Sequence, residues 1–576
     1  MAIFFKKSGQ NFTKRLVKSS QKTLTLSKSH LTENFTSRFN HVKNVKLLVF
    51  EWILLLVVII SLSFAQSFWQ AESYKLNTFT SGGGYTEGTL GQINSLNPLF
   101  ATTNSEKTLS KLLFATLSAP DYSGRMGFDL AKSIQTNQTG QTWTIELRND
   151  AVWSDGTPLT TEDVLFTIKT IQNPKVNTSY SSGLSGVKVT AKDQTLTFAL
   201  PYPYSSFASA LNFPILPKHI LQDIPPESLL EHNFSKQPVT SGPFLFKAAQ
   251  STTTDNTNRI LYLSSNPHYF KGESLLNNFS LHTFTDKSAI LNAINNGTIT
   301  ATAELSALDQ PKITNPEIYQ KQTALSSGNF IFFNLSSPAL KNRELRHAIQ
   351  IGLDMRSLRA PLEEESALDF PVIADRIPFL EAPSLPEFDS NKARQIIEKQ
   401  NISSPIRIVT VNSGYLPALA ENLNFQLKNL GLKTELSVHE SSQDFLLGIL
   451  KPRNYDILLY EIELGSDSDL FIYYHSSAMN SGGLNFSNYS NQLSDDLILA
   501  ARSTVDEKLR ANKYRSILTH WVNDIPAIGI NRTNLSYYFN RNVRTFSEDN
   551  RLVFATDRLF DVQRWSSRSI QKNRTP

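Results

Sequence analysis

One stretch, residues 141–172, constrains the fold more than any other part of the chain, because it combines a strand, a turn and a helix. Apolar and polar residues alternate over 143–147, which is the period of a half-buried strand. Gly156 can adopt the positive φ that a tight turn often requires. Thr160 suits a helix N-cap, and residues 164–171 carry an apolar stripe at helical spacing. The pattern therefore predicts an α/β unit.

The residue string of this stretch also resembles a known signature. It is similar to that of the family 5 extracellular solute-binding proteins of ABC importers, the oligopeptide, dipeptide and nickel binders. Their pattern runs roughly W-x-hydrophobic-x-L-R-x-x-V-x-W-x-D-G-x-P-hydrophobic-T-A-x-D-V-x-F. The residues that fit are Trp143, Leu147, Arg148, Val152, Trp153, Asp155, Gly156, Pro158, Thr160, Asp163, Val164 and Phe166.

Shorter matches to the same family follow in order over about residues 85–560. They include Leu96-Asn97-Pro98, residues 213–219, 241–244 and 266–272, and the helix-like segment 342–354. The resemblance implies an α/β, two-lobed periplasmic-binding-protein-like fold of type II, similar to cluster C. It also implies that two crossing strands form a hinge and that ligand binds between the lobes.

An apolar segment, residues 47–66, follows a basic N-terminal region. It contains one charged residue, Glu51, and as a helix it would reach roughly 28 Å, close to the apolar thickness of a bilayer. Residues 1–46 hold ten Lys and Arg against one acid, Glu33. We therefore expect a single-pass helix in the cell membrane, with a cytoplasmic N-terminus and the binding domain outside, periplasmic or extracellular. A signal peptide cleaved near Ala65 and a buried core helix are the alternatives.

The absence of cysteine narrows the possible chemistry. It excludes disulfides, thiolate metal sites, a cysteine nucleophile and the lipid-modified cysteine that tethers many bacterial binding proteins. The net charge of +5 comes from the basic region, and the rest of the chain is slightly acidic. The charge distribution therefore does not indicate nucleic-acid binding.

The expected domain organisation has seven segments. They are a basic cytoplasmic tail at 1–46, a transmembrane helix at 47–66, a stalk at 67–84, lobe I at 85–327, lobe II at 328–525, a return to lobe I at 526–566 and a loose tail at 567–576. Within lobe II, residues 355–390 are rich in Pro and acidic residues, so we expect surface loops there.

No catalytic motif stands out in the sequence. It has no GxSxG elbow, HExxH helix, Walker A loop or GxGxxG turn. The ten histidines lack metal-ligand spacing. We therefore expect no enzyme activity, no cofactor and no metal site.

The better candidates are groups that bind a ligand. In relatives, an Asp after the buried strand of the second lobe takes the ligand's amino group, and by position this falls on Asp467 or Asp469. The local pattern departs from the commoner W-x-x-D-x-x-D-P, which leaves both open, and a role as solvated loop acids is the alternative. Glu87 follows the first strand and is expected at the cleft mouth, and Asn334 is a weaker candidate at a strand end.

The resemblance implies a receptor outside the cytoplasm that delivers peptides, or a similar small solute, to the permease and ATPase subunits of an ABC importer. The alternative function is a sensory or scaffolding protein that uses the same two-lobed fold without transport. A hydrolase is a third hypothesis, which turnover of peptides would distinguish from stoichiometric binding.

Overall fold

The computed structural model divides the chain into two compact units. The larger is Phe79–Ser569, and the smaller combines Met1–Thr78 with Ile570–Pro576. The described residues are 46–73, 75–79, 81–252, 258–362, 367–400, 402, 404–480, 483–547, 550–567 and 569–573. Apart from Lys46, the predicted basic tail lies outside them.

In the smaller unit, helix α2 (Lys46–Ser73) covers the apolar segment, and its large apolar side chains from Phe50 to Phe64 are exposed. Within the described residues, no helix meets both the length and the hydropathy of a membrane span. Helix α2 runs on to Ser73, into the first part of the segment predicted as a stalk. Strand β1 (Lys75–Phe79) pairs with β18 (Ser569–Asn573), so the tail predicted as loose contains a strand.

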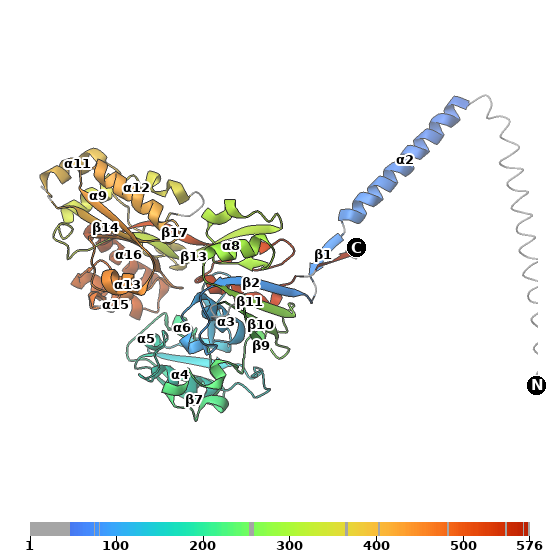
Figure 1. Cartoon of the computed structure of the whole chain (residues 1–576), viewed down its shortest axis with the longest axis horizontal. Helices are drawn as coiled ribbons and strands as arrows, with labels where there is room; N and C mark the ends of the chain where they lie inside the picture. The colour runs from blue at the N-terminus through green and yellow to red at the C-terminus, as the bar shows by residue number, and fades with distance from the viewer. Residues whose placement is uncertain are drawn as a thin grey trace, which may run out of the picture. The chain divides into compact units, whose positions relative to one another are not determined.

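In the larger unit, two long antiparallel strands connect the two lobes. Strands β13 (Ile318–Phe333) and β17 (Ala527–Asn540) pair side by side in the middle of a ten-stranded sheet. The register shifts between Ala324 and Gly328, a β-bulge, which bends the strands. In Figure 1 the two strands lie between the yellow-to-brown elements of lobe II and the blue and green elements of lobe I.

Lobe I contains the elements before β13 and the segment after β17. Its half of the large sheet has the order β12-β2-β11-β10-β9, formed by β12 (Ala301–Thr302), β2 (Gly84–Leu90), β11 (Asn278–Phe284), β10 (Arg259–Ser265) and β9 (Phe244–Ser251). A separate four-stranded sheet has the order β5-β6-β8-β7, formed by β5 (Ala131–Thr136), β6 (Thr142–Leu147), β8 (Thr195–Ala199) and β7 (Lys188–Lys192). Helix α3 (Asn104–Leu113) packs beside the first sheet.

The strand, turn and helix predicted at 141–172 are confirmed in lobe I. Strand β6 buries every second side chain, and Gly156 has a φ of +87° in the turn. Helix α4 (Thr161–Gln172) begins after Thr160, whose backbone N–H donates to Asp163 at 2.8 Å in a capping box.

Lobe II covers its part of the sheet with helices. Strands β16 (Ile457–Glu463), β14 (Ile406–Val411) and β15 (Thr434–His439) extend the sheet beyond β13. The helices include α9 (Arg343–Gly352), α10 (Met355–Arg359), α11 (Ser390–Lys399), α12 (Leu416–Asn429), α15 (Gln492–Ser503) and α16 (Glu507–Asp524). The surface loops expected at 355–390 are wrong in part, because α10 is helical and Leu358, Val372 and Ile373 are buried.

The buried apolar side chains form a separate core in each lobe. The cluster of lobe II takes its residues from 330 to 530, and the main cluster of lobe I takes its residues from 85 to 301 and from 535 to 565. A third, smaller cluster joins residues 290–305 of lobe I to Tyr538 of β17. Because each lobe encloses its own core, the lobes can move relative to each other by bending β13 and β17. The α/β, two-lobed architecture expected from the sequence is confirmed.

Candidate functional site

A polar cavity of about 260 Å³ lies between the two lobes. Lobe I contributes residues from α6 (Phe207–Ala210) and the loop before it, and from β4 (Met126–Phe128) with the residue before it. Lobe II contributes a loop after β16, a loop before α11 and the first turns of α16. Because both lobes line the cavity, opening of the lobes would expose it and closure would bury its contents.

Asp467 lies on the lobe II side of this cavity. Its Oδ2 lies 3.1 Å from Nη2 of Arg510, a residue of α16. The same Nη2 donates to Ser206 Oγ of lobe I at 3.0 Å, so one guanidinium links the carboxylate to the opposite lobe. Burial, followed by the negative charge of Asp469, raises the pKa of Asp467 to about 6.

Asp469 belongs to a neighbouring contact between the lobes. Its Oδ2 lies 3.0 Å from Nε of Arg502, and its Oδ1 accepts a hydrogen bond from the backbone of Phe471 at 3.1 Å. The Arg502 guanidinium lies 4.6 Å from the ring centre of Tyr204 in lobe I. The backbone carbonyl of Arg502 accepts a hydrogen bond from Ser205 N–H at 2.7 Å. Both candidate carboxylates therefore lie at the lobe interface, each already ion-paired to an arginine.

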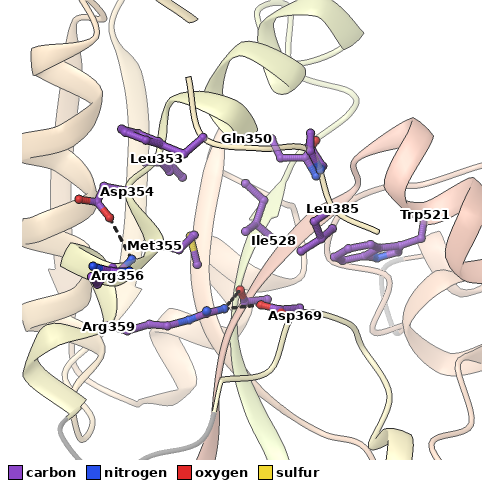
Figure 2. Close-up of a pocket in the computed structure, with 13 residues that line it drawn as sticks. Gln350, Leu353, Asp354, Met355, Arg356, Arg359, Asp369, Leu385, Trp521 and Ile528 are labelled. Atoms are coloured by element: carbon purple, nitrogen blue, oxygen red, sulfur yellow. Dashed lines mark hydrogen bonds and ion pairs between the residues drawn. The ribbon is translucent and has the colours of Figure 1, made fainter. Parts of the chain in front are cut away.

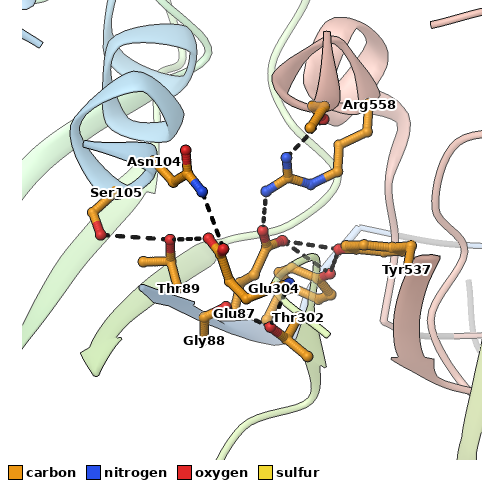
Figure 3. A network of polar contacts seen from close by, with 11 residues as sticks. Glu87, Gly88, Thr89, Asn104, Ser105, Thr302, Glu304, Tyr537 and Arg558 are labelled. Atoms are coloured by element: carbon orange, nitrogen blue, oxygen red, sulfur yellow. Dashed lines mark hydrogen bonds and ion pairs between the residues drawn. The ribbon is translucent and has the colours of Figure 1, made fainter. Parts of the chain in front are cut away.

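Glu87 does not lie at the cleft mouth, as the sequence analysis expected. It is fully buried on β2, where it forms an ion pair with Arg558 and accepts a hydrogen bond from the Tyr537 hydroxyl at 2.8 Å (Figure 3). Tyr537 belongs to β17, so this carboxylate ties a hinge strand to lobe I. The expected position was wrong because β2 lies inside the ten-stranded sheet, between β12 and β11. The local sequence does not show which strands pair with β2.

A second interlobe cavity, of about 320 Å³, lies beside this network. Glu304 lines it and accepts hydrogen bonds from Thr89 Oγ1 at 2.8 Å and Asn104 Nδ2 at 3.1 Å (Figure 3). Lobe II contributes residues 413–416, and the hinge strand β17 contributes residues 533–536. Within the described part of the chain, one cavity thus lies on the hinge side of the lobe interface and another lies beside Asp467.

Asn334 lines neither interlobe cavity. Its Nδ2 donates to the carbonyls of Arg453 at 3.2 Å and Tyr455 at 2.9 Å. Its Oδ1 accepts from Ser336 N–H and Asn488 Nδ2, both at 3.1 Å. These bonds lie inside lobe II and join β13 to its neighbours, which points to a structural use of the side chain.

The largest of these cavities, about 510 Å³, is lined by residues of lobe II and of the hinge strand β17 (Figure 2). Trp521, Leu385 and Ile528 line it, and the ion pair between Arg359 and Asp369, at 2.6 Å, lies at its edge. Among the described residues, no group of three or more His, Asp or Glu side chains could hold a metal ion.

Sequence reasoning missed three residues that line the interlobe cavity: Arg376, Arg510 and Ser206. Arg376 lies in the stretch expected to form surface loops, yet only 7% of it is exposed. No local motif marks these positions, because three distant segments of the chain meet only in the folded protein. The adjacent apolar residues Val372 and Ile373, close to Arg376, were an available sequence signal that this stretch is not all surface loop, and both are buried.

Comparison with known proteins identifies relatives over most of the chain. The family described as "Bacterial extracellular solute-binding proteins, family 5 Middle" matches residues 126–483. The oligopeptide-binding protein AppA of Bacillus subtilis (strain 168) is 25% identical over 479 residues, covering 77% of this chain and 85% of AppA.

Solved structures share the same architecture. The structure of AppA from Bacillus subtilis in complex with a nonapeptide has a TM-score of 0.68 at 22% identity, covering 85% of this chain and 99% of AppA. The ABC transporter substrate-binding protein CtaP from Listeria monocytogenes has a TM-score of 0.74 at 23% identity, covering 85% and 100%. The similarity to these structures supports the two-lobed fold of the chain.

Proposed function

Because this chain belongs to the family 5 bacterial extracellular solute-binding proteins, we propose that it captures a peptide or a similar small solute between its lobes and delivers it to an ABC importer. The permease and ATPase of that importer would be its partners. Members of the family hold their ligand outside the cytoplasm, so capture would take place there.

The polar cavity shared by both lobes is the observation that carries this proposal. Residues of lobe I and lobe II contact each other around it, through Arg510 with Ser206 and through Arg502 with Ser205. A ligand in the cavity would contact both lobes only in the closed form, and that difference in affinity would drive closure. The peptide bound to AppA supports peptides as the ligand class.

Mass spectrometry of the denatured full chain after purification from its host tests the ligand class. We expect a co-purified peptide that binds again in stoichiometric amount and is recovered unchanged. Recovery of only non-peptide solutes would contradict peptides as the ligand, and cleavage of the peptide would contradict a binding role. Peptide binding in cells without uptake of that peptide would favour the sensory or scaffolding alternative.

We also infer that helix α2 anchors the protein in a membrane. The apolar side chains from Phe50 to Phe64 are exposed, with Glu51 as the one charged residue of 47–66. Burial of this surface in lipid would be favourable at about 25 cal/mol per Å². We expect the full chain to stay with membranes during an alkaline wash and a variant lacking residues 1–66 to be released; release of both would contradict the anchor.

A further inference from the structure

A short loop of lobe I contacts two arginines of lobe II. Ser205 N–H donates to the backbone carbonyl of Arg502 at 2.7 Å, and the hydroxyl of Ser206 accepts from Arg510 Nη2 at 3.0 Å. The ring centre of Tyr204 lies 4.6 Å from the central carbon of the Arg502 guanidinium. Each of these contacts joins two groups of the protein, so it forms by closure of the lobes alone.

The loop 204–206 has a fixed position on lobe I. The carbonyl of Gly140 accepts hydrogen bonds from Tyr204 N–H at 3.2 Å and from Trp143 Nε1 at 3.1 Å. Gly140 has a φ of +70°, and a Cβ at this position would lie 3.2 Å from a methyl carbon of Val505 in lobe II. The two lobes are therefore in close contact beside the loop as well.

The carbonyl that Ser205 binds belongs to the last turn of helix α15. The last four carbonyls of a helix have no partner within the helix, and Arg502 is the residue before the final one of α15. The N–H of Ser205 supplies this partner from the opposite lobe. The closed form therefore satisfies a polar group that separation of the lobes would leave to solvent.

The guanidinium of Arg502 contacts one aromatic ring from each lobe. Tyr204 belongs to lobe I, and Phe471, 4.5 Å away, belongs to lobe II. The carboxylate of Asp469, also in lobe II, lies 3.0 Å from Arg502 Nε, so the guanidinium stays oriented when Tyr204 withdraws. Only 28% of the Arg502 side chain is exposed, and a cation near an aromatic ring is attracted more strongly when water is excluded.

Another charged contact between the lobes is much more exposed. Arg551, in the return to lobe I, pairs with Asp375 of lobe II at 2.5 Å, and the two side chains are 52% and 45% exposed. Ion pairs at such exposed positions contribute little, because water and salt compete with them. The contacts around Arg502 should therefore favour the closed form more than this pair does.

We propose that Arg502 and the loop 204–206 form a latch that stabilises the closed form before a ligand binds. Arg502 and Tyr204 line neither interlobe cavity, so Arg502 is a positioning residue that acts through closure. This inference rests on the proposed function, because it describes how the interlobe site closes. A latch stabilises the closed form equally for all ligands, so it raises the affinity for each of them by the same factor.

Fluorescence energy transfer between the lobes tests the latch on the full chain. The sequence contains no cysteine, so Lys192→Cys in lobe I and Lys399→Cys in lobe II, both at exposed positions, can be labelled specifically. The protein is dialysed until mass spectrometry detects no bound ligand. The distribution of transfer efficiencies then gives the ratio of the closed to the open form.

Variants on both sides of the latch should lower this ratio. We expect Arg502→Gln and Tyr204→Leu each to lower it at least about fivefold, whereas Tyr204→Phe, which keeps the ring, should retain most of it. Arg551→Gln is the matched control, because it also removes an arginine that joins the lobes, and it should change the ratio less than about twofold. Should Arg502→Gln fail to fold, Tyr204→Leu tests the same contact from lobe I.

Ligand affinities distinguish a latch from a group that touches the ligand. For Arg502→Gln we expect peptides of different sequence, with free or blocked ends, to lose affinity by one common factor and to dissociate faster. A loss confined to peptides with one kind of end or side chain would show that Arg502 contacts the ligand. That result would overturn the latch.

The measurement without ligand separates this inference from the proposed function. An unchanged ratio in both Arg502→Gln and Tyr204→Leu would overturn the latch and leave peptide capture standing. Equal losses in Arg502→Gln and Arg551→Gln would overturn the role of the buried aromatic contact. A wild type that binds no peptide, with the ratio lowered as expected in the variants, would overturn the proposed function and support the latch.

Discussion

Replacing Glu87 by glutamine tests the buried ion pair that ties the hinge strand to lobe I. Glu87 is fully buried, and only 3% of the Arg558 side chain is exposed. Burial opposes the charge on Arg558, but the Glu87 carboxylate outweighs burial and raises the pKa of Arg558 above its ordinary value. Glutamine has nearly the same shape, so the substitution removes the negative charge and leaves the guanidinium buried without a counter-charge.

The expected loss follows from that burial. Breaking a buried ion pair by removing one partner costs about 3–5 kcal/mol. Because the glutamine oxygen can still accept hydrogen bonds, we expect the lower end, about 3 kcal/mol. The unfolding entropy is about 2.1 cal/mol/K per residue, so a unit of roughly 500 residues should lose about 3 °C in Tm.

Scanning calorimetry of the full chain, with Glu304→Gln as the control, measures this effect. Glu304 lies in the same network but is only partly buried, and its partners, Thr89 and Asn104, are neutral. We expect the control to lose less than about 1 kcal/mol. The double variant Glu87→Gln with Arg558→Met should recover part of the loss, because no cation is left unpaired. Equal losses in the Glu87 and Glu304 variants would refute the reasoning.

Three further predictions concern other parts of the chain. Burial raises the pKa of Asp467 to about 6, against about 3.9 for a solvated Asp. Closure of the lobes around Asp467 therefore takes up a proton, and the closed form should become more populated as the pH falls from about 6 to 4. Fluorescence energy transfer between the lobes should show this, and Asp467→Asn should remove the pH dependence. Asp163→Ala should cost about 2 kcal/mol in urea unfolding, because two backbone N–H groups lose their acceptor. Gly529→Ala should lower the Tm and the folded yield, because a Cβ there would overlap the backbone carbonyl of Leu368, and an unchanged melting curve would contradict the packing.

Much of the local structure was predictable because short-range patterns carry it. The alternation at 143–147, the positive φ of Gly156 and the N-cap at Thr160 all appear in the structure as expected. Each depends on the conformational preferences of a few neighbouring residues. The family resemblance then extended these elements to a two-lobed fold, which local patterns alone do not specify.

The candidate site was predictable only in part. The family resemblance pointed to Asp467 or Asp469 as a ligand-binding residue, and Asp467 lines a cavity at the lobe interface, but its partner Arg510 lies 43 residues away on α16. Arg376 and Ser205 also reach the cavity from distant segments, and nothing in their local sequence marks them. For Glu87 the expectation was wrong: the residue was expected at the cleft mouth, and it lies fully buried.

The sequence by itself determined local elements such as the strand, turn and capped helix at 141–172, because backbone preferences and apolar periodicity act over a few residues. Only the tertiary structure decided which charges meet. Strand order and the closure of the lobes set the partner of a buried carboxylate. That partner determines whether the carboxylate stabilises the hinge, as Glu87 does, or lines a cavity, as Asp467 does.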